Sequence, residues 1–347
     1  MNLRRLGRTE IFVSEICLGT MTFGQQTDEA EAFRQMDYAV EKGVNFFDTA
    51  ELYAIPPRAE TYGATETIIG RWLKARGARE KIVLATKIVG RSTSHWYRNG
   101  APARLDRKNI FYAIEGSLRR LQTDYIDLYQ LHWPDRPMDL FDSNSNIYRD
   151  RGGPDGVSFE ETVSALAELV QQGKIRHFGV SNETAWGVSQ FLRAAEAGAG
   201  PCLVSIQNAY HLVNRQFEIG LAEFAFREQV GLLAYSPLAQ GYLTGKYLDG
   251  ARPPGSRSVL FGRGQRYEKP GVEEAIRDYL ALAREFSLDP VHLALAFVTS
   301  RPFVTANIIG ATTLDQLRLI LAAPTKLSPE LEKRIDAIHQ LRGNPAP

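Results

Sequence analysis

The strongest constraint on the fold of this chain is a repeated alternation of short apolar segments with longer amphipathic ones. Eight segments rich in Ile, Val, Leu and Phe have the length of buried strands, and helical patterns lie between them. Such an alternation predicts parallel β/α units. The predicted strands are residues 16–19, 45–47, 82–87, 126–132, 176–180, 204–207, 232–235 and 307–310.

Two α/β architectures contain units of this kind, an open doubly wound sheet and a closed eight-stranded barrel. An open sheet that binds a dinucleotide normally carries a G-x-G-x-x-G motif after its first strand, and none follows residues 16–19. The strand number and the uniform composition favour one (β/α)8 TIM barrel domain over residues 1–347. We also expect an N-terminal β-hairpin over residues 1–14 and a C-terminal helix and tail over residues 328–347.

The connections between the predicted elements indicate which end of the barrel carries the function. Turns from helix to strand are short, whereas the segments after strands are long. In a β/α barrel the latter all lie on the face at the carboxyl ends of the strands, where active sites are built. The long segments are residues 52–62, 88–105, 133–157 and 236–270.

Composition excludes several classes of partner and location. The net charge of +1 gives no electrostatic case for binding nucleic acid or an anionic membrane. The 2 cysteines are too few for a disulfide framework. The basic N-terminus is not followed by the apolar region of a secretory signal, and no apolar run has the length of about 18 residues that a membrane span needs. We therefore expect a cytoplasmic protein with no membrane or nucleic-acid partner.

Four polar residues stand where successive predicted strands end. Asp48 follows the second strand and Tyr53 lies shortly after it, Lys87 ends the third strand and His132 ends the fourth. Each alone has a structural interpretation, for example a cap for Asp48 or packing for Tyr53. Together at one rim they favour a reaction site. No pair of His or Cys residues has the spacing of metal ligands, so no metal is expected.

The chemistry of this set is coherent. A partly buried Lys87 needs a counter-charge, which Asp48 can provide. An ammonium group favours a phenolate, so we expect Lys87 to lower the pKa of Tyr53. Such a tyrosine can exchange a proton with a carbonyl oxygen, and His132 can donate a hydrogen bond to the same oxygen. Hydride transfer is the natural partner reaction.

The chain resembles the aldo-keto reductase superfamily over nearly its whole length. The motifs that carry the resemblance occur in the family's order and are "FFDTAELY", "ATK", "LHWP", "GVSN", "YSPLAQGYLTGKY" and "IIGATTLDQL". The chain is most similar to the bacterial Tas-type members, which are related to the β subunits of voltage-gated potassium channels. The resemblance implies a barrel that binds NADP(H) without a Rossmann fold and reduces aldehydes or ketones with hydride from C4 of the nicotinamide.

The resemblance also implies a role for each site residue. Tyr53 would be the general acid and base, Lys87 would tune it, Asp48 would hold Lys87, and His132 would position the carbonyl. The residues implied at the cofactor are Asp48; Thr20 and Met21 near the nicotinamide ribose; Ser181, Asn182 and Gln207 at the carboxamide; Tyr235 on the nicotinamide ring; Ser236, Pro237, Leu238 and Gly241 at the pyrophosphate; Lys246 and Arg257 on phosphates; and Gly310, Thr312 and Gln316 around the adenosine 2′-phosphate. Residues 236–270 would cover the cofactor, with Arg252, Arg263 and Arg266 as solvated charges.

The chain departs from the family pattern in two places. Leu319 and Ile320 replace the usual Glu and Asn at the adenine, so we expect weaker adenine recognition. Residues 54–65 form a longer connection after Tyr53 than is usual, which changes the pocket wall. Five aromatic residues in the long segments could line that pocket or pack the segments down, with packing favoured: Trp96, Tyr97, Trp133, Phe141 and Tyr148.

Three functional hypotheses remain at this point. The leading one is an NADPH-dependent reductase of small-molecule aldehydes or ketones. The second is an NADPH-binding regulatory protein with little turnover, although the channel β subunits have a different residue at the position of His132. The third is an aldolase that forms a Schiff base on Lys87. The sequence does not indicate the oligomeric state.

Overall fold

The computed structural model describes residues 1–138, 149, 151–152, 156–262 and 265–346. Within these residues eight parallel strands close into a barrel in the order β10-β3-β4-β5-β6-β7-β8-β9. The barrel predicted from the alternating pattern is therefore confirmed. Its strands are β3 Ile16–Gly19, β4 Phe46–Asp48, β5 Val83–Ile88, β6 Ile126–Leu131, β7 Ile175–Ser181, β8 Ser205–Ala209, β9 Gly231–Tyr235 and β10 Val304–Ile309.

Strand bounds agree with the prediction to within a few residues, and the largest difference is at β10. The prediction began this strand at Asn307, whereas the structure begins it at Val304. The preceding residues already pair with β9, and the register shifts between Val304 and Ala306. Such an irregularity hides the start of a strand from a period-2 pattern.

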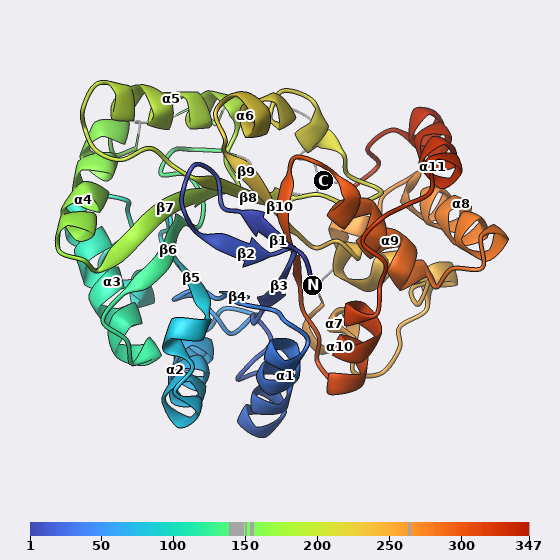
Figure 1. Ribbon diagram of the computed structural model, residues 1–347, viewed down its shortest axis with the longest axis horizontal. Helices are drawn as coiled ribbons and strands as arrows, with labels where there is room; N and C mark the ends of the chain where they lie inside the picture. The colour runs from blue at the N-terminus through green and yellow to red at the C-terminus, as the bar shows by residue number, and fades with distance from the viewer. Residues whose placement is uncertain (139–148, 150, 153–155, 263–264, 347) are drawn as a thin grey trace.

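Helices surround the barrel and connect its strands (Figure 1). Their starts follow from side-chain caps: Asp28, Ser158 and Asp289 each accept a hydrogen bond from a backbone amide in the first turn of the helix that follows. The helices are α1 Glu29–Glu41, α2 Ala64–Arg76, α3 Arg107–Leu121, α4 Phe159–Gln171, α5 Ala185–Glu196, α6 Ala222–Arg227, α7 Arg257–Phe261, α8 Val272–Glu285, α9 Pro290–Ser300, α10 Leu314–Leu321 and α11 Pro329–Arg342.

The N-terminal hairpin closes one end of the barrel. Strands β1 (Leu3–Arg5) and β2 (Phe12–Ser14) pair antiparallel, and Figure 1 shows them crossing the barrel's end. Buried Leu6 and Val13 pack against the inward-facing Cys17 and Phe46. The amino-terminal end of the barrel is thus filled with apolar side chains, which leaves the opposite end for polar groups.

The C-terminal part adds helices outside the barrel. The predicted C-terminal helical extension is present as α11, which packs against α8 at the edge of the molecule (Figure 1). Residues 236–270 contain α7 and short 3₁₀ turns where they are described. No helix within the described ranges is long and apolar enough to cross a membrane.

Candidate active site

The barrel brings the four candidate catalytic residues to one end. Asp48 is the last residue of β4, Lys87 lies in β5, and His132 directly follows β6. Tyr53 lies in the segment between β4 and α2. Because parallel strands end at the same rim, all four side chains reach the carboxyl face, as the sequence pattern predicts.

Lys87 is the centre of the arrangement. Its Nζ lies 2.6 Å from Asp48 Oδ2, donates to the Thr49 carbonyl oxygen across 2.8 Å, and lies 3.4 Å from the Tyr53 hydroxyl. Burial disfavours the ammonium, but attraction to Asp48 and Tyr53 outweighs it and raises the pKa of Lys87. The lysine therefore remains charged although its side chain is fully buried.

The protonation state of Tyr53 differs from the expectation. Burial raises the pKa of the Tyr53 phenol, and the positive charge of Lys87 only partly opposes this effect. The predicted lowering was wrong because the sequence could not show how completely the ring is buried; only 8% of it is exposed. Tyr53 is thus a neutral phenol near pH 7, which is the form that can give a proton.

His132 stands at right angles to the tyrosine. The two rings are 5.7 Å apart in an edge-to-face arrangement. Burial and the charge of Lys87 hold the pKa of His132 well below its usual value, so the imidazole is neutral. Its backbone carbonyl accepts a hydrogen bond of 2.9 Å from Asn182 Nδ2, which ties β6 to the end of β7.

Two glutamine amides complete the surroundings of Asp48, and one of them, Gln130, was not predicted from the sequence. Gln130 Nε2 lies 3.0 Å and Gln207 Nε2 lies 2.9 Å from Asp48 Oδ1. Gln207 Nε2 also contacts Gln130 Oε1 at 2.9 Å. The signal for Gln130 was its position two residues before His132, on the same side of a strand, opposite Lys87 in the register.

The residues implied near the nicotinamide gather around this centre. Thr20 donates to the Asp48 carbonyl through both its amide and its hydroxyl, at 3.1 and 2.8 Å. Ser181 Oγ donates to the Gln207 carbonyl across 2.8 Å. Met21 is partly buried and packs beside the apolar cluster that contains Tyr53.

Tyr235, the last residue of β9, adds a further polar side chain next to those of Ser181 and Gln207. Its hydroxyl lies 2.6 Å from Asn182 Oδ1. Ser236 then has a φ of 58°, and Gly241 has a φ of 97°. Within the turn of residues 236–241, the Ala239 amide donates to the Ser236 carbonyl and the Gly241 amide to the Leu238 carbonyl. Pro237 belongs to the same turn, so the residues implied at the pyrophosphate form one compact loop directly after Tyr235.

The basic residues of this region have different surroundings. Lys246 is exposed and its Nζ lies 5.1 Å from the Tyr247 ring. Arg257 opens α7, and its charge is the smallest of the effects that oppose the rise in the pKa of Tyr53 caused by burial. Arg252 is exposed and pairs with Glu268 at 2.9 Å, so it is a charge on the solvent side of the loop.

Arg266 differs from the expectation of a solvated charge. It is partly buried, and its guanidinium forms hydrogen bonds that oppose the burial-raised pKa values of Tyr235 and Tyr267. Its position beside Tyr235 could not be predicted, because long loops give no periodic signal. Arg263 lies outside the described residues.

The segment implied at the adenosine 2′-phosphate follows β10. Gly310 leads into it, and Gln316 Oε1 accepts from the amide and hydroxyl of Thr312 at 2.9 and 3.0 Å. The two replacements at the adenine behave differently. Leu319 is 39% exposed, whereas Ile320 is 5% exposed and belongs to the core. Only Leu319 is therefore placed where a side chain could meet a ligand without rearrangement.

These residues are suited to a nicotinamide dinucleotide. Amide and hydroxyl groups lie at the carboxyl ends of β7 and β9 and within β8, and the positive charges of Lys246 and Arg257 lie farther along residues 236–270. Backbone amides and cations of this kind hold phosphates. Buried Thr49 Oγ1 and His132 Nδ1 also have no hydrogen-bond partner among the described residues, so polar groups at the reaction centre are available to a ligand.

The aromatic residues of the long loops mostly pack against each other. The rings of Trp96 and Tyr97 are 3.7 Å apart, and Tyr62 meets Trp96 edge to face at 5.7 Å. Trp133 Nε1 donates to the Arg91 carbonyl across 2.9 Å. Packing was the favoured expectation, and these three contacts agree with it. Phe141 and Tyr148 lie outside the described residues.

A separate cavity of about 490 Å³ lies beside this centre, between β6, β7 and the helices α4 and α5. Its wall includes Trp133 and Ser181 but none of the four candidate catalytic residues. Two of the three carboxylates in its wall are paired, Asp135 with Arg104 and Glu183 with Arg136, and the third, Glu160, is exposed. The cavity is therefore a neighbour of the reaction centre and not the centre itself.

Comparison with known proteins agrees with this geometry. The sequence model of the aldo/keto reductase family matches residues 15–340 of this chain. The chain is 48% identical to Tas of Escherichia coli (strain K12), and the alignment covers 100% of both chains. It is 35% identical to the uncharacterized oxidoreductase YrpG of Bacillus subtilis over 100% of this chain and 98% of that one. It is 31% identical to a candidate voltage-gated potassium channel β subunit of Schizosaccharomyces pombe, covering 96% and 92% of the two chains. The chain thus belongs to the aldo/keto reductase family, whose members are oxidoreductases that use nicotinamide cofactors on carbonyl compounds.

Proposed function

We propose that this protein reduces aldehydes or ketones to alcohols with NADPH and that Tyr53 is the general acid. The observation that carries the proposal is the position of Lys87, 2.6 Å from Asp48 and 3.4 Å from the Tyr53 hydroxyl. A buried ammonium beside a neutral phenol stabilises the phenolate that remains after the proton has left. Tyr53 is therefore a neutral phenol before the reaction, and the loss of its proton during the reaction is favoured.

The remaining residues orient the substrate and hold charge. His132 is neutral, so it can donate one N–H to a carbonyl oxygen without adding a second positive charge beside Lys87. Asp48 balances the charge of Lys87 in every state of the reaction. The bound nicotinamide supplies the hydride. The proton and the hydride together convert a C=O group into an alcohol.

The preference for NADPH over NADH rests on the segment implied at the adenosine 2′-phosphate, the group that NADH lacks. Thr312 and Gln316 lie at the start of α10, where backbone amides are suited to an anion, and Lys246 and Arg257 are suited to phosphate groups. We propose that residues 236–270 cover the cofactor and that Arg257, the first residue of α7, binds one of its phosphates.

The aldolase hypothesis fits this site poorly. A Schiff-base lysine must be neutral to attack a carbonyl carbon. Here the ion pair with Asp48 and the neighbouring Tyr53 raise the pKa of Lys87 despite its burial, so the amine stays protonated. Borohydride trapping of a substrate on Lys87 would contradict this conclusion.

A substrate screen with NADPH and NADH side by side tests the proposed function. We expect aldehyde-dependent oxidation of NADPH, measured by its absorbance. Tyr53→Phe should abolish turnover and leave NADPH binding nearly unchanged, because the hydroxyl acts on the substrate. NADPH binding without turnover of any carbonyl compound would instead favour the regulatory function. Unchanged turnover in Tyr53→Phe would remove this residue from the mechanism.

A further inference from the structure

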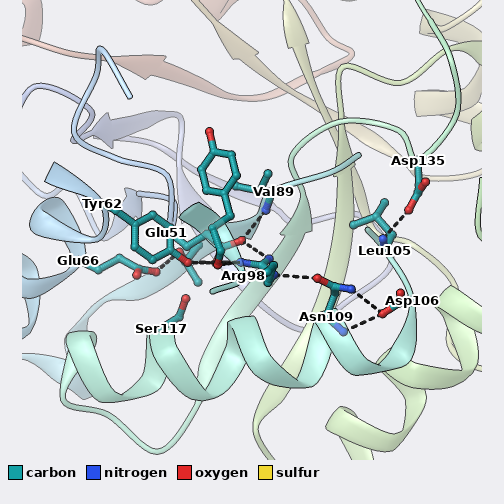
Figure 2. Close-up of polar contacts among 12 residues, drawn as sticks. Glu51, Tyr62, Glu66, Val89, Arg98, Leu105, Asp106, Asn109, Ser117 and Asp135 are labelled. Carbon is teal, nitrogen blue, oxygen red and sulfur yellow. Dashed lines mark hydrogen bonds and ion pairs between the residues drawn. The ribbon is translucent and has the colours of Figure 1, made fainter. Parts of the chain in front are cut away.

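A buried carboxylate fastens the segment that carries Tyr53 to the strand that carries Lys87. Glu51 lies between Asp48 and Tyr53, and its side chain is fully buried. Its amide donates to the Lys87 carbonyl across 3.1 Å, and its Oε1 accepts from the Val89 amide at 2.7 Å. Figure 2 shows this second contact at the end of β5. Glu51 thus binds the backbone on either side of Ile88, the last residue of β5, through the Lys87 carbonyl oxygen and the Val89 amide.

The carboxylate is itself fixed by an arginine from the next loop. Arg98 NH2 lies 2.7 Å from Glu51 Oε1 and Arg98 NH1 lies 3.0 Å from Oε2, which is a two-point contact (Figure 2). The Tyr62 hydroxyl donates to Oε2 from the long connection after Tyr53. Asn109 Oδ1 in turn accepts from Arg98 Nε at 2.9 Å, which anchors the arginine on α3.

A contribution to stability alone does not account for this arrangement. A buried ion pair contributes little net stability, because the desolvation of both charges offsets their attraction. The described contacts of Glu51 leave both of its carboxylate oxygens occupied, so it is not placed to exchange a proton. What it does determine is the relative position of two backbone segments, and those segments carry the Tyr53 hydroxyl and Lys87 Nζ.

We propose that Glu51 is a positioning residue that sets the contact between Tyr53 and Lys87 by binding the Val89 amide, and that Arg98 and Tyr62 hold it in that position. This inference rests on the proposed reductase function. It also gives the long connection after Tyr53 a role, since Tyr62 belongs to that connection. The proton donor would then be held by the same network as the loop of residues 88–105.

Two double variants separate positioning from charge. In Glu51→Gln with Arg98→Met both charges are lost, but the amide oxygen can still accept from Val89. In Glu51→Leu with Arg98→Met the same charges are lost and the acceptor is lost as well. Removing both partners avoids an unpaired buried charge, so both variants are expected to fold. Urea unfolding confirms that each is assayed as folded protein.

We expect kcat to fall by about 10- to 100-fold in the Leu/Met variant, because a small displacement of a catalytic group has an effect of this size. The Gln/Met variant should stay within a few-fold of the parent, and the KM should change little in both. The matched control is Asp127→Leu with Arg79→Met. Asp127 also accepts from a strand amide, Leu84, at 2.9 Å and from Arg79 at 2.8 Å, but it lies at the opposite end of the barrel. Its second arginine partner, Arg176, is 53% exposed and so remains solvated in this variant. The loss of Asp127 should leave kcat unchanged.

A readout without turnover distinguishes failure of this inference from failure of the proposed function. Tyrosine labelled with carbon-13 reports the titration of Tyr53 by NMR, assigned with Tyr53→Phe. The charged groups that act on this phenol are Lys87, Asp48 and Arg257. Separation of Tyr53 from Lys87 should raise the titration midpoint in the Leu/Met variant above that of the Gln/Met variant. Equal midpoints and equal kcat values in the two variants would overturn the role of Glu51. If the parent protein turns over no carbonyl compound, the proposed function fails while the comparison of midpoints still tests the contact.

Discussion

Gln130 Nε2 donates to Asp48 Oδ1 across 3.0 Å, while Lys87 binds the other oxygen of the same carboxylate at 2.6 Å. Gln207 Nε2 meets both Gln130 Oε1 and Asp48 Oδ1. Three side chains therefore hold the Asp48 carboxylate in its orientation: Lys87, Gln130 and Gln207, the last of which is proposed at the cofactor. This relationship links the cofactor region to the proton donor through one carboxylate.

Replacement of Gln130 by leucine should weaken this link. The change removes a hydrogen bond to an ionised carboxylate, which contributes about 1.5–3 kcal/mol to the free energy of unfolding. We expect kcat to fall because Asp48 can rotate away from Lys87, and NADPH binding to weaken because Gln207 loses a partner. Urea unfolding, kcat and the NADPH dissociation constant check the three effects.

Gln130→Glu is the contrasting variant. It keeps the size of the side chain but places a second carboxylate beside Asp48, where like charges repel. We expect a larger loss of kcat than in Gln130→Leu. Equal activity of the parent and both variants would show that Gln207 alone orients Asp48.

The fold and the catalytic set could be predicted because strong periodic signals report them. Eight apolar strands, each followed by a longer connection, indicate a barrel and its working face, and polar residues at strand ends stand out against apolar sequence. Gln130 was missed because a buried amide within a strand resembles any polar interruption. The protonation state of Tyr53 could not be predicted either, because burial is a property of the whole packing.

Loop contacts were the least predictable part of the site. Arg98 and Glu51 are distant in sequence, and no spacing rule connects them. Ile320 was expected at the adenine from its place in a motif, but its side chain faces the core. Motif positions identify the backbone, whereas the direction of each side chain depends on how the helix packs.

The ion pair between Asp48 and Lys87 should be destabilising when only one partner is removed. Asp48→Asn leaves a fully buried ammonium without its counter-charge, and we expect a loss of about 3–5 kcal/mol. Addition of Lys87→Met should restore most of that stability but no activity, because the group that stabilises the Tyr53 phenolate is gone. Unfolding free energies of the two single variants and the double variant give the coupling energy. Full additivity would contradict the proposed charge pair.

Buried histidines should make the fold sensitive to acid. Burial, with a smaller effect from Arg266, lowers the pKa of His211 to about 3 from 6.5. The unfolded chain binds the proton first, so stability declines as the pH falls below about 6.5, by about 1.4 kcal/mol per pH unit and per histidine of this kind. His132 contributes in the same direction. The measurement is the free energy of unfolding as a function of pH.

The variant His211→Phe distinguishes the contribution of His211 to acid sensitivity from that of His132. Neither ring nitrogen of His211 has a hydrogen-bond partner within the described part of the chain, and its ring lies 5.7 Å from that of Tyr267. The substitution removes two unpaired polar atoms from the interior, so it should not reduce stability near pH 7. It should also reduce the slope of stability with pH between pH values of about 5 and 6.5. An unchanged slope would show that His211 is not the group that binds the proton on unfolding.

Leu319→Glu and Ile320→Asn should differ in their effects on stability and on NADPH binding, although the two positions are neighbours in one motif. Leu319 is 39% exposed on α10, so a glutamate there should change the free energy of unfolding by no more than about 0.5 kcal/mol. If the adenine lies at this helix, Leu319→Glu should lower the NADPH dissociation constant. Ile320 is 5% exposed, and an asparagine there loses apolar contacts and buries an amide, with an expected loss of about 2–5 kcal/mol. Urea unfolding and NADPH titration of each single variant check these outcomes. Tighter binding in Ile320→Asn without loss of stability would mean that α10 can turn this position outward.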